Sequence, residues 1–232
     1  MIEVRQLVKT FGLKPVLRGL DFFVARGEFV ALVGPNGAGK TTFLRILASL
    51  SRPNMGEVRV NGFRLPGQAA AVRRRLGVLS HQPLLYADLT AEENLRFFGK
   101  MYAVPAMSER IDYVLQMVGL HKRRRDLVRG FSRGMQQRLA IGRSILHDPE
   151  LLLFDEPHTG LDQVAAAMLD DLLREVATRG RTIVMTSHDL SRAADLGTRI
   201  DILSKGRIAA SKARDEIDPR ELSTFYHSVT HA

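Results

Sequence analysis

The sequence has no cysteine, and none of its uninterrupted apolar runs approaches the roughly 20 residues that a membrane-spanning helix needs. The absence of cysteine excludes disulfides, thiolate metal sites and cysteine nucleophiles, and it suits a reducing compartment. The N-terminal residues alternate between polar and apolar types, without the apolar segment and small-residue cleavage site of a secretory signal. We therefore expect a cytoplasmic chain that does not cross a bilayer.

Internal repeats with a period of roughly 20–50 residues are also lacking, and no Ser/Gly/Pro-rich linker divides the chain. With 232 residues, of which 45% are hydrophobic and 25% charged, the chain is long enough to bury a sizeable core. The 34 Lys and Arg outnumber the 25 Asp and Glu, giving a net charge of +9. This excess predicts an anionic partner such as a nucleotide, a nucleic acid or lipid headgroups, and charge alone does not choose among them.

Short β-type runs alternate with helical patterns along much of the chain. One helix is predicted from an apolar stripe at 169, 172, 173 and 176, with Asp162 as its N-cap and Gly180 at its end. This alternation predicts a mostly parallel α/β sheet. The predicted strands are Phe29–Val33, Val58–Val60, Leu76–Ser80, Leu151–Asp155, Ile183–Ser187 and Ile200–Leu203.

Between about Pro83 and Pro149 the sequence shows helix signals and no convincing strand. Thr90 and Glu93 form a capping box that opens one helix, Ser108 is a candidate cap for a second helix ending at Gly119, and Ser132 for a third. We therefore predict one domain over 1–232, with a core of about 1–82 and 150–210 and a helical insertion of about 83–149. The tail of about 211–232 is either a short regulatory or dimer-stabilising segment or a frayed end.

The residues from Gly34 to Thr41 fit the pattern G-x-x-x-x-G-K-[ST], directly after a predicted strand and before an apolar helix. Glycines let the backbone N–H groups turn inward, so that the loop and the helix N-terminus form an anion nest. Lys40 is expected to reach the β- and γ-phosphates, and Thr41 to offer its hydroxyl to Mg²⁺. The alternative, a glycine-rich turn without a ligand, does not explain the strand and helix around it. The expected nucleotide-binding residues here are Gly34, Pro35, Asn36, Gly37, Ala38, Gly39, Lys40, Thr41 and Thr42.

Two carboxylates, Asp155 and Glu156, end the apolar strand 151–155, where open parallel sheets place their ligands. We expect Asp155 to hold Mg²⁺ and Glu156 to polarise a water molecule for attack on the γ-phosphate. An acidic pair at a strand end is often only a solvated edge. Beside a phosphate-binding loop, it indicates a catalytic pair.

With these motifs the chain resembles the nucleotide-binding subunits of ABC (ATP-binding cassette) transporters over nearly its whole length. Gln82 resembles the Q-loop glutamine, which in that family touches Mg²⁺ or the attacking water, and His188 resembles the switch histidine that contacts the γ-phosphate. Residues 159–162 resemble the D-loop, so Asp162 is an expected nucleotide contact, and Phe11 takes the place of the aromatic that stacks on adenine. Each of three residues has a competing interpretation: Gln82 as a polar turn residue, His188 as a structural histidine and Phe11 as a core aromatic.

The segment 131–138 resembles the family's signature motif, usually written LSGGQ, whose serine and glycine bind the γ-phosphate held by the opposite subunit. Ser132 and Gly134 match those positions and are expected ligands. The segment departs from the pattern because Arg133 replaces the first glycine and Met135 the glutamine. An arginine at this position could also meet phosphate.

The resemblance implies a fold with a P-loop NTPase core, a mostly parallel sheet, an N-terminal antiparallel β part and an inserted α-helical subdomain. It also implies that two copies sandwich two ATP molecules and drive integral membrane permease subunits from the cytoplasmic face of the membrane. The expected cofactors are ATP and Mg²⁺, and no nucleic acid partner is expected.

A finer resemblance is to the haem-exporter ATPase of cytochrome c maturation, through residues 79–86, 89–95 and 132–135. Three alternatives remain open. Drug and polysaccharide exporters share some of these features. A soluble ABC ATPase acting on ribosomes, DNA or iron–sulfur assembly would suit the charge, but the two cassettes in one chain or the long coiled-coil insertion of such proteins are absent. A GTP-binding switch protein needs an N-K-x-D segment, which the sequence lacks.

Overall fold

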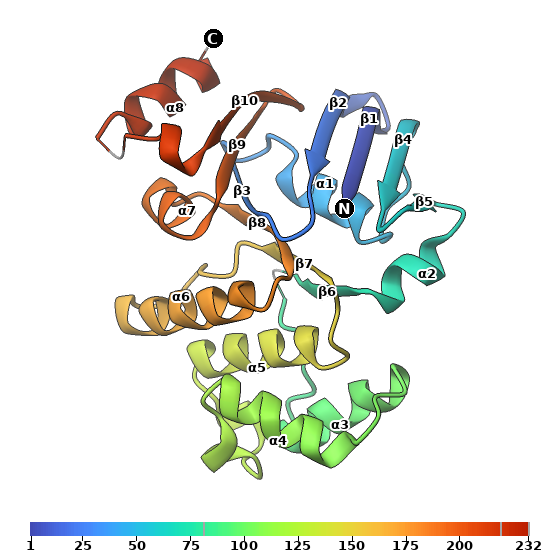
Figure 1. Cartoon of the computed structure of the whole chain (residues 1–232), viewed down its shortest axis with the longest axis vertical. Coiled ribbons are helices and arrows are strands. Elements are labelled where there is room, and N and C mark those ends of the chain that lie inside the picture. The colour runs from blue at the N-terminus through green and yellow to red at the C-terminus, as the bar shows by residue number, and fades with distance from the viewer. Residues whose placement is uncertain (81, 219, 232) are drawn as a thin grey trace.

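The computed structural model describes residues 1–80, 82–218 and 220–231, and it contains two sheets and a group of helices (Figure 1). The four-stranded sheet has the order β2-β1-β4-β5 and is antiparallel throughout. Its strands are β1 (Ile2–Phe11), β2 (Lys14–Val24), β4 (Met55–Val60) and β5 (Phe63–Leu65). The antiparallel N-terminal part implied by the resemblance is therefore present.

The six-stranded sheet has the order β10-β9-β3-β8-β7-β6, and all neighbouring pairs except β9 and β10 are parallel. Because β3 lies between β8 and β9, the carboxyl ends of segments far apart in the sequence meet at one edge of the sheet. The strands are β3 (Phe29–Val33), β6 (Leu76–Leu79), β7 (Leu151–Asp155), β8 (Thr182–Ser187), β9 (Arg199–Ser204) and β10 (Arg207–Ala213). The mostly parallel α/β core is confirmed.

Helices cover both faces of this sheet, because its central strands are apolar on both sides. Leu151 and Leu153 of β7 pack with helix α1 and the antiparallel sheet, whereas Leu152 and Phe154 pack with α5 and α6. The helices are α1 (Lys40–Leu47), α2 (Ala69–Arg74), α3 (Ala91–Met101), α4 (Met107–Met117), α5 (Arg133–Ile145), α6 (Gln163–Thr178), α7 (Leu190–Leu196) and α8 (Leu222–His231), with short 3₁₀ turns at His121–Arg123, Val128–Gly130 and Arg214–Glu216. Among the described helices, none is both long and apolar enough to cross a membrane.

The insertion between β6 and β7 forms the end of the molecule farthest from the antiparallel sheet (Figure 1). Its first helix, α3, starts with the predicted capping box, in which Thr90 Oγ1 accepts from the Glu93 N–H and Glu93 accepts from the Thr90 N–H. Ser132 caps α5 and Asp162 caps α6, as predicted. The expected cap at Ser108 is wrong, because α4 starts at Met107 behind a left-handed Ala106 and Ser108 lies inside the first turn.

The strands missing from the prediction are β1, β2, β5 and β10. Register shifts between Val4 and Leu7, where Gln6 has φ 48°, interrupt the alternation of β1 and hide its pattern in the sequence. The expected tail starts inside β10, and the part of it that the structure describes ends in α8. Leu222 and Phe225 of α8 pack against the sheet, and Lys212 lies 4.2 Å from the Phe225 ring centroid, so this segment is not frayed.

Candidate active site

The phosphate-binding loop connects β3 to α1, and two of its glycines are required by geometry. A Cβ on Gly34 would lie 2.2 Å from the carbonyl oxygen of Leu203, so only glycine fits between these backbones. Gly39 has φ 111° and directly precedes α1, a conformation that L side chains rarely adopt. The chain therefore reverses sharply at the carboxyl edge of the sheet and presents the N-terminus of α1 there.

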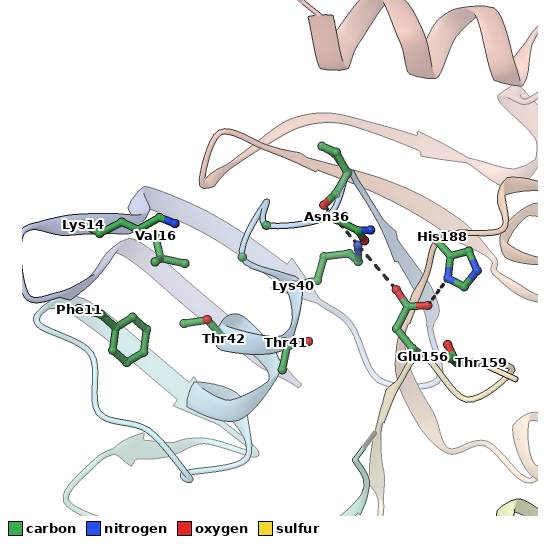
Figure 2. Close-up of a pocket in the computed structure, with 13 residues that line it drawn as sticks. Phe11, Lys14, Val16, Asn36, Lys40, Thr41, Thr42, Glu156, Thr159 and His188 are labelled. Carbon is green, nitrogen blue, oxygen red and sulfur yellow. Dashed lines mark hydrogen bonds and ion pairs between the residues drawn. The ribbon is translucent and has the colours of Figure 1, made fainter. Parts of the chain in front are cut away.

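Lys40 is the first residue of α1 and is only 7% exposed. Its ammonium group donates to the carbonyl oxygen of Gly34 at 2.7 Å and lies 3.6 Å from Glu156 Oε1 (Figure 2). A buried lysine needs partners of this kind because the desolvation of its charge is costly. The charge is thus fixed at the mouth of the loop, where it can reach a phosphate.

Thr41 and Asp155 meet at the ends of α1 and β7. The Thr41 hydroxyl donates to Asp155 Oδ1 at 3.1 Å, and the Thr186 hydroxyl of β8 donates to the same oxygen at 2.8 Å. Thr186 also accepts from the backbone N–H of Glu156 at 2.9 Å, so one hydroxyl positions both members of the acidic pair. Sequence analysis missed Thr186, and a polar residue at the end of an apolar strand was the available signal.

Glu156 lies at a tight backbone turn with φ 52°, an uncommon value for a residue other than glycine. Such conformations cluster at functional sites because the surrounding structure must stabilise them. Its Oε2 is 2.5 Å from Nδ1 of His188, so its two carboxylate oxygens face Lys40 and His188 (Figure 2). The sequence predicted all three residues from separate segments, and the fold brings them together.

A cavity of about 700 Å³ opens between these groups and the β1–β2 hairpin. Phe11 is 55% exposed at its far side, as a ring available for stacking requires, and Lys14 and Val16 flank it (Figure 2). Lys14 and Val16 were not predicted, since no motif contains them, and Thr159 belongs to the D-loop segment 159–162 but was not predicted as a site residue. The lining residues are Phe11, Lys14, Val16, Pro35, Asn36, Gly37, Gly39, Lys40, Thr41, Thr42, Glu156, Thr159 and His188. The cavity is large enough for a nucleotide.

Seven predicted residues do not line this cavity: Gly34, Ala38, Gln82, Ser132, Gly134, Asp155 and Asp162. Gln82 is exposed, and its carbonyl oxygen accepts from the Ser80 hydroxyl at 2.6 Å. Ser132 and Asp162 use their side chains to cap α5 and α6. A contact between these residues and a nucleotide in this cavity stays a prediction.

The signature segment packs against the D-loop of the same chain. A Cβ on Gly160, which has φ 75°, would lie 2.4 Å from Cζ of Arg133, so the guanidinium rests directly on that glycine. Gly134 approaches α6 in the same way, because a Cβ there would lie 2.9 Å from the Cβ of Ala165. Arg133 therefore has a packing role that the sequence did not reveal.

A buried polar network anchors the loop after Glu156. His158 lies 2.7 Å from Asp170 of α6, and Asp170 also pairs with Arg192 of α7. Burial lowers the pKa of His158 against the opposing effect of Asp170, so the ring is neutral and donates its Nε2–H to the carboxylate. The loop is thereby fixed to two helices.

Oxygen donors at the site could hold a hard metal ion. No cluster of three or more His, Cys, Asp or Glu suited to a metal ion occurs in the part of the chain that the structure describes. The Thr41 hydroxyl and the Asp155 carboxylate are hard donors side by side, a set that suits Mg²⁺ shared with phosphate oxygens.

Comparisons with known proteins agree with this geometry. A family model described as ABC transporter matches residues 17–159. The Nod factor export ATP-binding protein I of Ralstonia nicotianae is 36% identical over 96% of this chain and 70% of its own length. The linearmycin resistance ATP-binding protein LnrL of Bacillus subtilis is 33% identical over 95% of this chain and 71% of its own.

Solved structures show the same fold. The ATP-binding subunit of an ABC transporter superposes with a TM-score of 0.88 at 32% identity, covering 99% of both chains. A dimeric post-hydrolysis state of the ATP-binding cassette MJ0796, bound to ADP and Pi, has a TM-score of 0.84 at 27% identity and covers 92% of this chain and 99% of that one. The chain therefore belongs to the ABC transporter family, as an ATP-binding and ATP-hydrolysing domain.

Proposed function

We propose that this chain is the ATPase subunit of an exporter of the drug-resistance type, in which ATP hydrolysis at the cavity beside Lys40 drives separate membrane subunits. The observation that supports it best is the convergence of Lys40, Asp155, Glu156 and His188 at one edge of the sheet. The names of two relatives, one for Nod factor export and one for linearmycin resistance, favour this cargo class.

The proposed binding mode follows from the charges. The triphosphate lies along the loop 34–41 with Lys40 against its β- and γ-phosphates, and the adenine stacks on Phe11. Thr41 and Asp155 would hold Mg²⁺, which neutralises phosphate charge when bound. Phosphate oxygens exchange with the Gly34 carbonyl as partners of Lys40, so binding needs only a small side-chain movement.

Glu156 is proposed to take a proton from the attacking water while the oxygen of that water bonds to the γ-phosphorus. The bond between the γ-phosphorus and the β–γ bridging oxygen breaks, which releases ADP and phosphate. His188 holds Glu156 Oε2 and Thr186 holds the Glu156 backbone, so the carboxylate is oriented from two sides. Lys40 supplies positive charge beside Glu156 Oε1.

A second copy is proposed to complete each site. Ser132 and Gly134 lie outside the cavity of their own chain, and dimeric cassettes are among the matching structures. In a sandwich of two copies, Ser132, Gly134 and Asp162 would face the nucleotide of the partner, with Gln82 reaching the site on closure. Membrane subunits, docked at the cytoplasmic face of the membrane, would couple to this closure.

Haem export is a second candidate for the cargo. It rests on the segments 79–86, 89–95 and 132–135; of these, His81 lies outside the described residues. The names of the relatives favour drug-type export over it. The cargo therefore needs a direct test.

Glu156→Gln tests the ATPase assignment and the partner together. The amide keeps the shape of the side chain but cannot accept a proton, so steady-state ATP hydrolysis should fall by about 100-fold or more while ATP binding persists. Near-wild-type turnover by this variant would remove Glu156 from its role.

The same variant, tagged and purified from membranes of its own organism in mild detergent with Mg-ATP, should retain its membrane subunits. Identification of these by mass spectrometry, with transport assays for a drug and for haem, distinguishes the cargo classes. Recovery of ribosomes or iron–sulfur assembly proteins in place of membrane subunits would overturn the exporter assignment and leave the ATPase assignment intact.

A further inference from the structure

A second cavity, of about 420 Å³, lies at the opposite edge of the parallel sheet from the loop 34–41. It is bounded by the amino ends of β7 and β8, the end of α6 and the side of α4, so it lies where the helical insertion meets the core. Neither the proposed mechanism nor the motifs of the sequence involve its residues. Its volume falls in the range of small-molecule sites.

The cavity is strongly basic. Arg26, Arg110, Arg179 and Arg181 line it, against only two lining carboxylates, Asp148 and Glu150. Glu150 pairs with Arg26 at 2.6 Å, and Arg179 pairs with Glu175, a residue outside the lining, at 3.3 Å. Asp148, although 71% exposed, is shared between Arg181 at 2.5 Å and Arg110 at 3.4 Å. The arginines are therefore under-compensated.

Two of the arginines are held rigidly. Arg110 donates through Nε and Nη2 to the carbonyl oxygens of Leu146 and Ile145 at the end of α5. The guanidinium carbons of Arg110 and Arg179 both lie 5.1 Å from the centroid of the Tyr113 ring. Burial lowers the pKa of Arg110; the charge of Asp148 raises it, and the neighbouring charges of Arg181 and Arg179 lower it. The guanidinium groups of this cluster therefore repel one another.

Two buried donors in this cluster lack partners. Arg181 is only 7% exposed, and its Nη1 has no hydrogen-bond partner among the residues that the structure describes. The hydroxyl of Tyr113 is buried and equally unpaired within the described chain. Buried polar groups without partners are rare and costly, so each needs an explanation. An anion that enters the cavity would explain both, after small rotations of the two side chains toward it.

We propose that this cavity binds a small phosphate-class anion, held by Arg179 and Arg181 of the core and by Arg110 and Tyr113 of the helical insertion. Guanidinium groups match the oxygens of phosphate in pairs, and the phenol hydroxyl adds a donor. The bound anion cancels the excess positive charge and links α4 to the amino ends of β7 and β8. It therefore acts as an effector that ties the helical insertion to the core, at a site separate from the hydrolysed nucleotide.

Isothermal titration with inorganic pyrophosphate at constant ionic strength tests this site. All titrations use the Lys40→Ala background, because pyrophosphate would otherwise occupy the loop 34–41. Binding should persist in this background and should raise the unfolding temperature by about 3–6 °C when the ligand is at roughly tenfold its Kd. No heat and no shift in this background would overturn the proposal.

Arg181→Gln in the same background should abolish binding. Because Arg181 is buried and its loss can unfold the chain, Arg179→Gln provides the second variant; its side chain is 42% exposed, and its loss should weaken binding about tenfold. Arg174→Gln, on α6 one turn before Arg179 and outside the cavity, is the matched control and should bind as the background does. Equal binding by Arg179→Gln and Arg174→Gln would place the anion elsewhere and overturn the assignment.

Discussion

The two edges of the parallel sheet carry opposite charge arrangements. At the carboxyl edge, the charges of Lys40 and Glu156 compensate each other, and the hydroxyls of Thr41 and Thr186 both donate to the Asp155 carboxylate. At the amino edge, Arg181 has an unpaired Nη1 within the described chain, and guanidinium groups outnumber carboxylates. The difference teaches that the side chains of the hydrolytic edge already pair with one another, whereas the amino edge keeps buried donors that an anion would satisfy.

The largest effect is expected from a substitution at the carboxyl edge that weakens ATP binding. Lys40→Ala removes a buried cation that is 3.6 Å from Glu156 and positioned for phosphate, so ATP binding should weaken by about 10- to 100-fold. Titration of a non-hydrolysable ATP analogue measures this. Lys14→Ala is the matched control, because Lys14 lines the same cavity at its exposed adenine side. Equal affinity in wild type and Lys40→Ala would remove the main support for the phosphate assignment.

The next prediction concerns the amino edge and the pH dependence of the free energy of unfolding. Burial lowers the pKa of His147 to about 4; its Nε2 is 3.2 Å from the Leu76 carbonyl and its ring stacks on Tyr102. Because the folded pKa lies below the ordinary value of 6.5, the unfolded chain binds the proton more tightly. The free energy of unfolding should therefore fall by about 2 kcal/mol between about pH 7 and pH 5 from this group alone.

His147→Phe keeps an aromatic ring against Tyr102 and removes the titrating group. Denaturant unfolding of wild type and variant at several pH values measures the free energy of unfolding. The difference between the two proteins should change with pH over this window and should level off below about pH 4. A constant difference would show that His147 does not titrate with a lowered pKa.

Sequence analysis named residues that the fold brings together at the carboxyl edge and named none of the cavity residues at the amino edge, for a physical reason. Asp155 ends an apolar strand, and Lys40, Glu156 and His188 follow an apolar strand or the loop after it, so local order in the sequence reports their place in space. The residues of the amino edge come from 26, 110, 113, 148, 179 and 181, six positions without a common spacing or motif.

Other misses also follow from three-dimensional contacts. Thr186 matters because β8 lies beside β7, and no pattern in the sequence pairs those strands. Arg133 was read as a departure from a motif, and only the fold shows that its guanidinium rests on Gly160. The bulged strand β1 and the terminal helix α8 depend on tertiary packing for their stability.

A smaller effect is expected from threonine substitutions at the two ends of a single strand, β8. Thr186 and Thr182 lie at the carboxyl and amino ends of β8, and each hydroxyl accepts one backbone N–H, from Glu156 and Gly27 respectively. Thr186→Val should lower kcat about tenfold, because Asp155 and the Glu156 backbone both lose a partner. Thr182→Val should lower only stability, and Thr186→Ser should restore kcat. Equal kcat losses in the two valine variants would show a general loss of folding rather than positioning of the acidic pair.

The smallest effect concerns Arg133, which lies at the first position of α5 and has no acidic partner within the described chain. A cation at a helix N-terminus is unfavourable by about 0.3–1 kcal/mol, and glycine in a helix costs about the same, so Arg133→Gly should change the free energy of unfolding by less than about 0.5 kcal/mol. Its ATPase rate should stay within about threefold of wild type, because the substitution removes packing on Gly160 and leaves the residues at the carboxyl edge in place. Steady-state hydrolysis at several protein concentrations measures this, since dimer formation would make the rate depend on concentration. A rate that collapses while the unfolding free energy is unchanged would show that the guanidinium meets the nucleotide of a second copy.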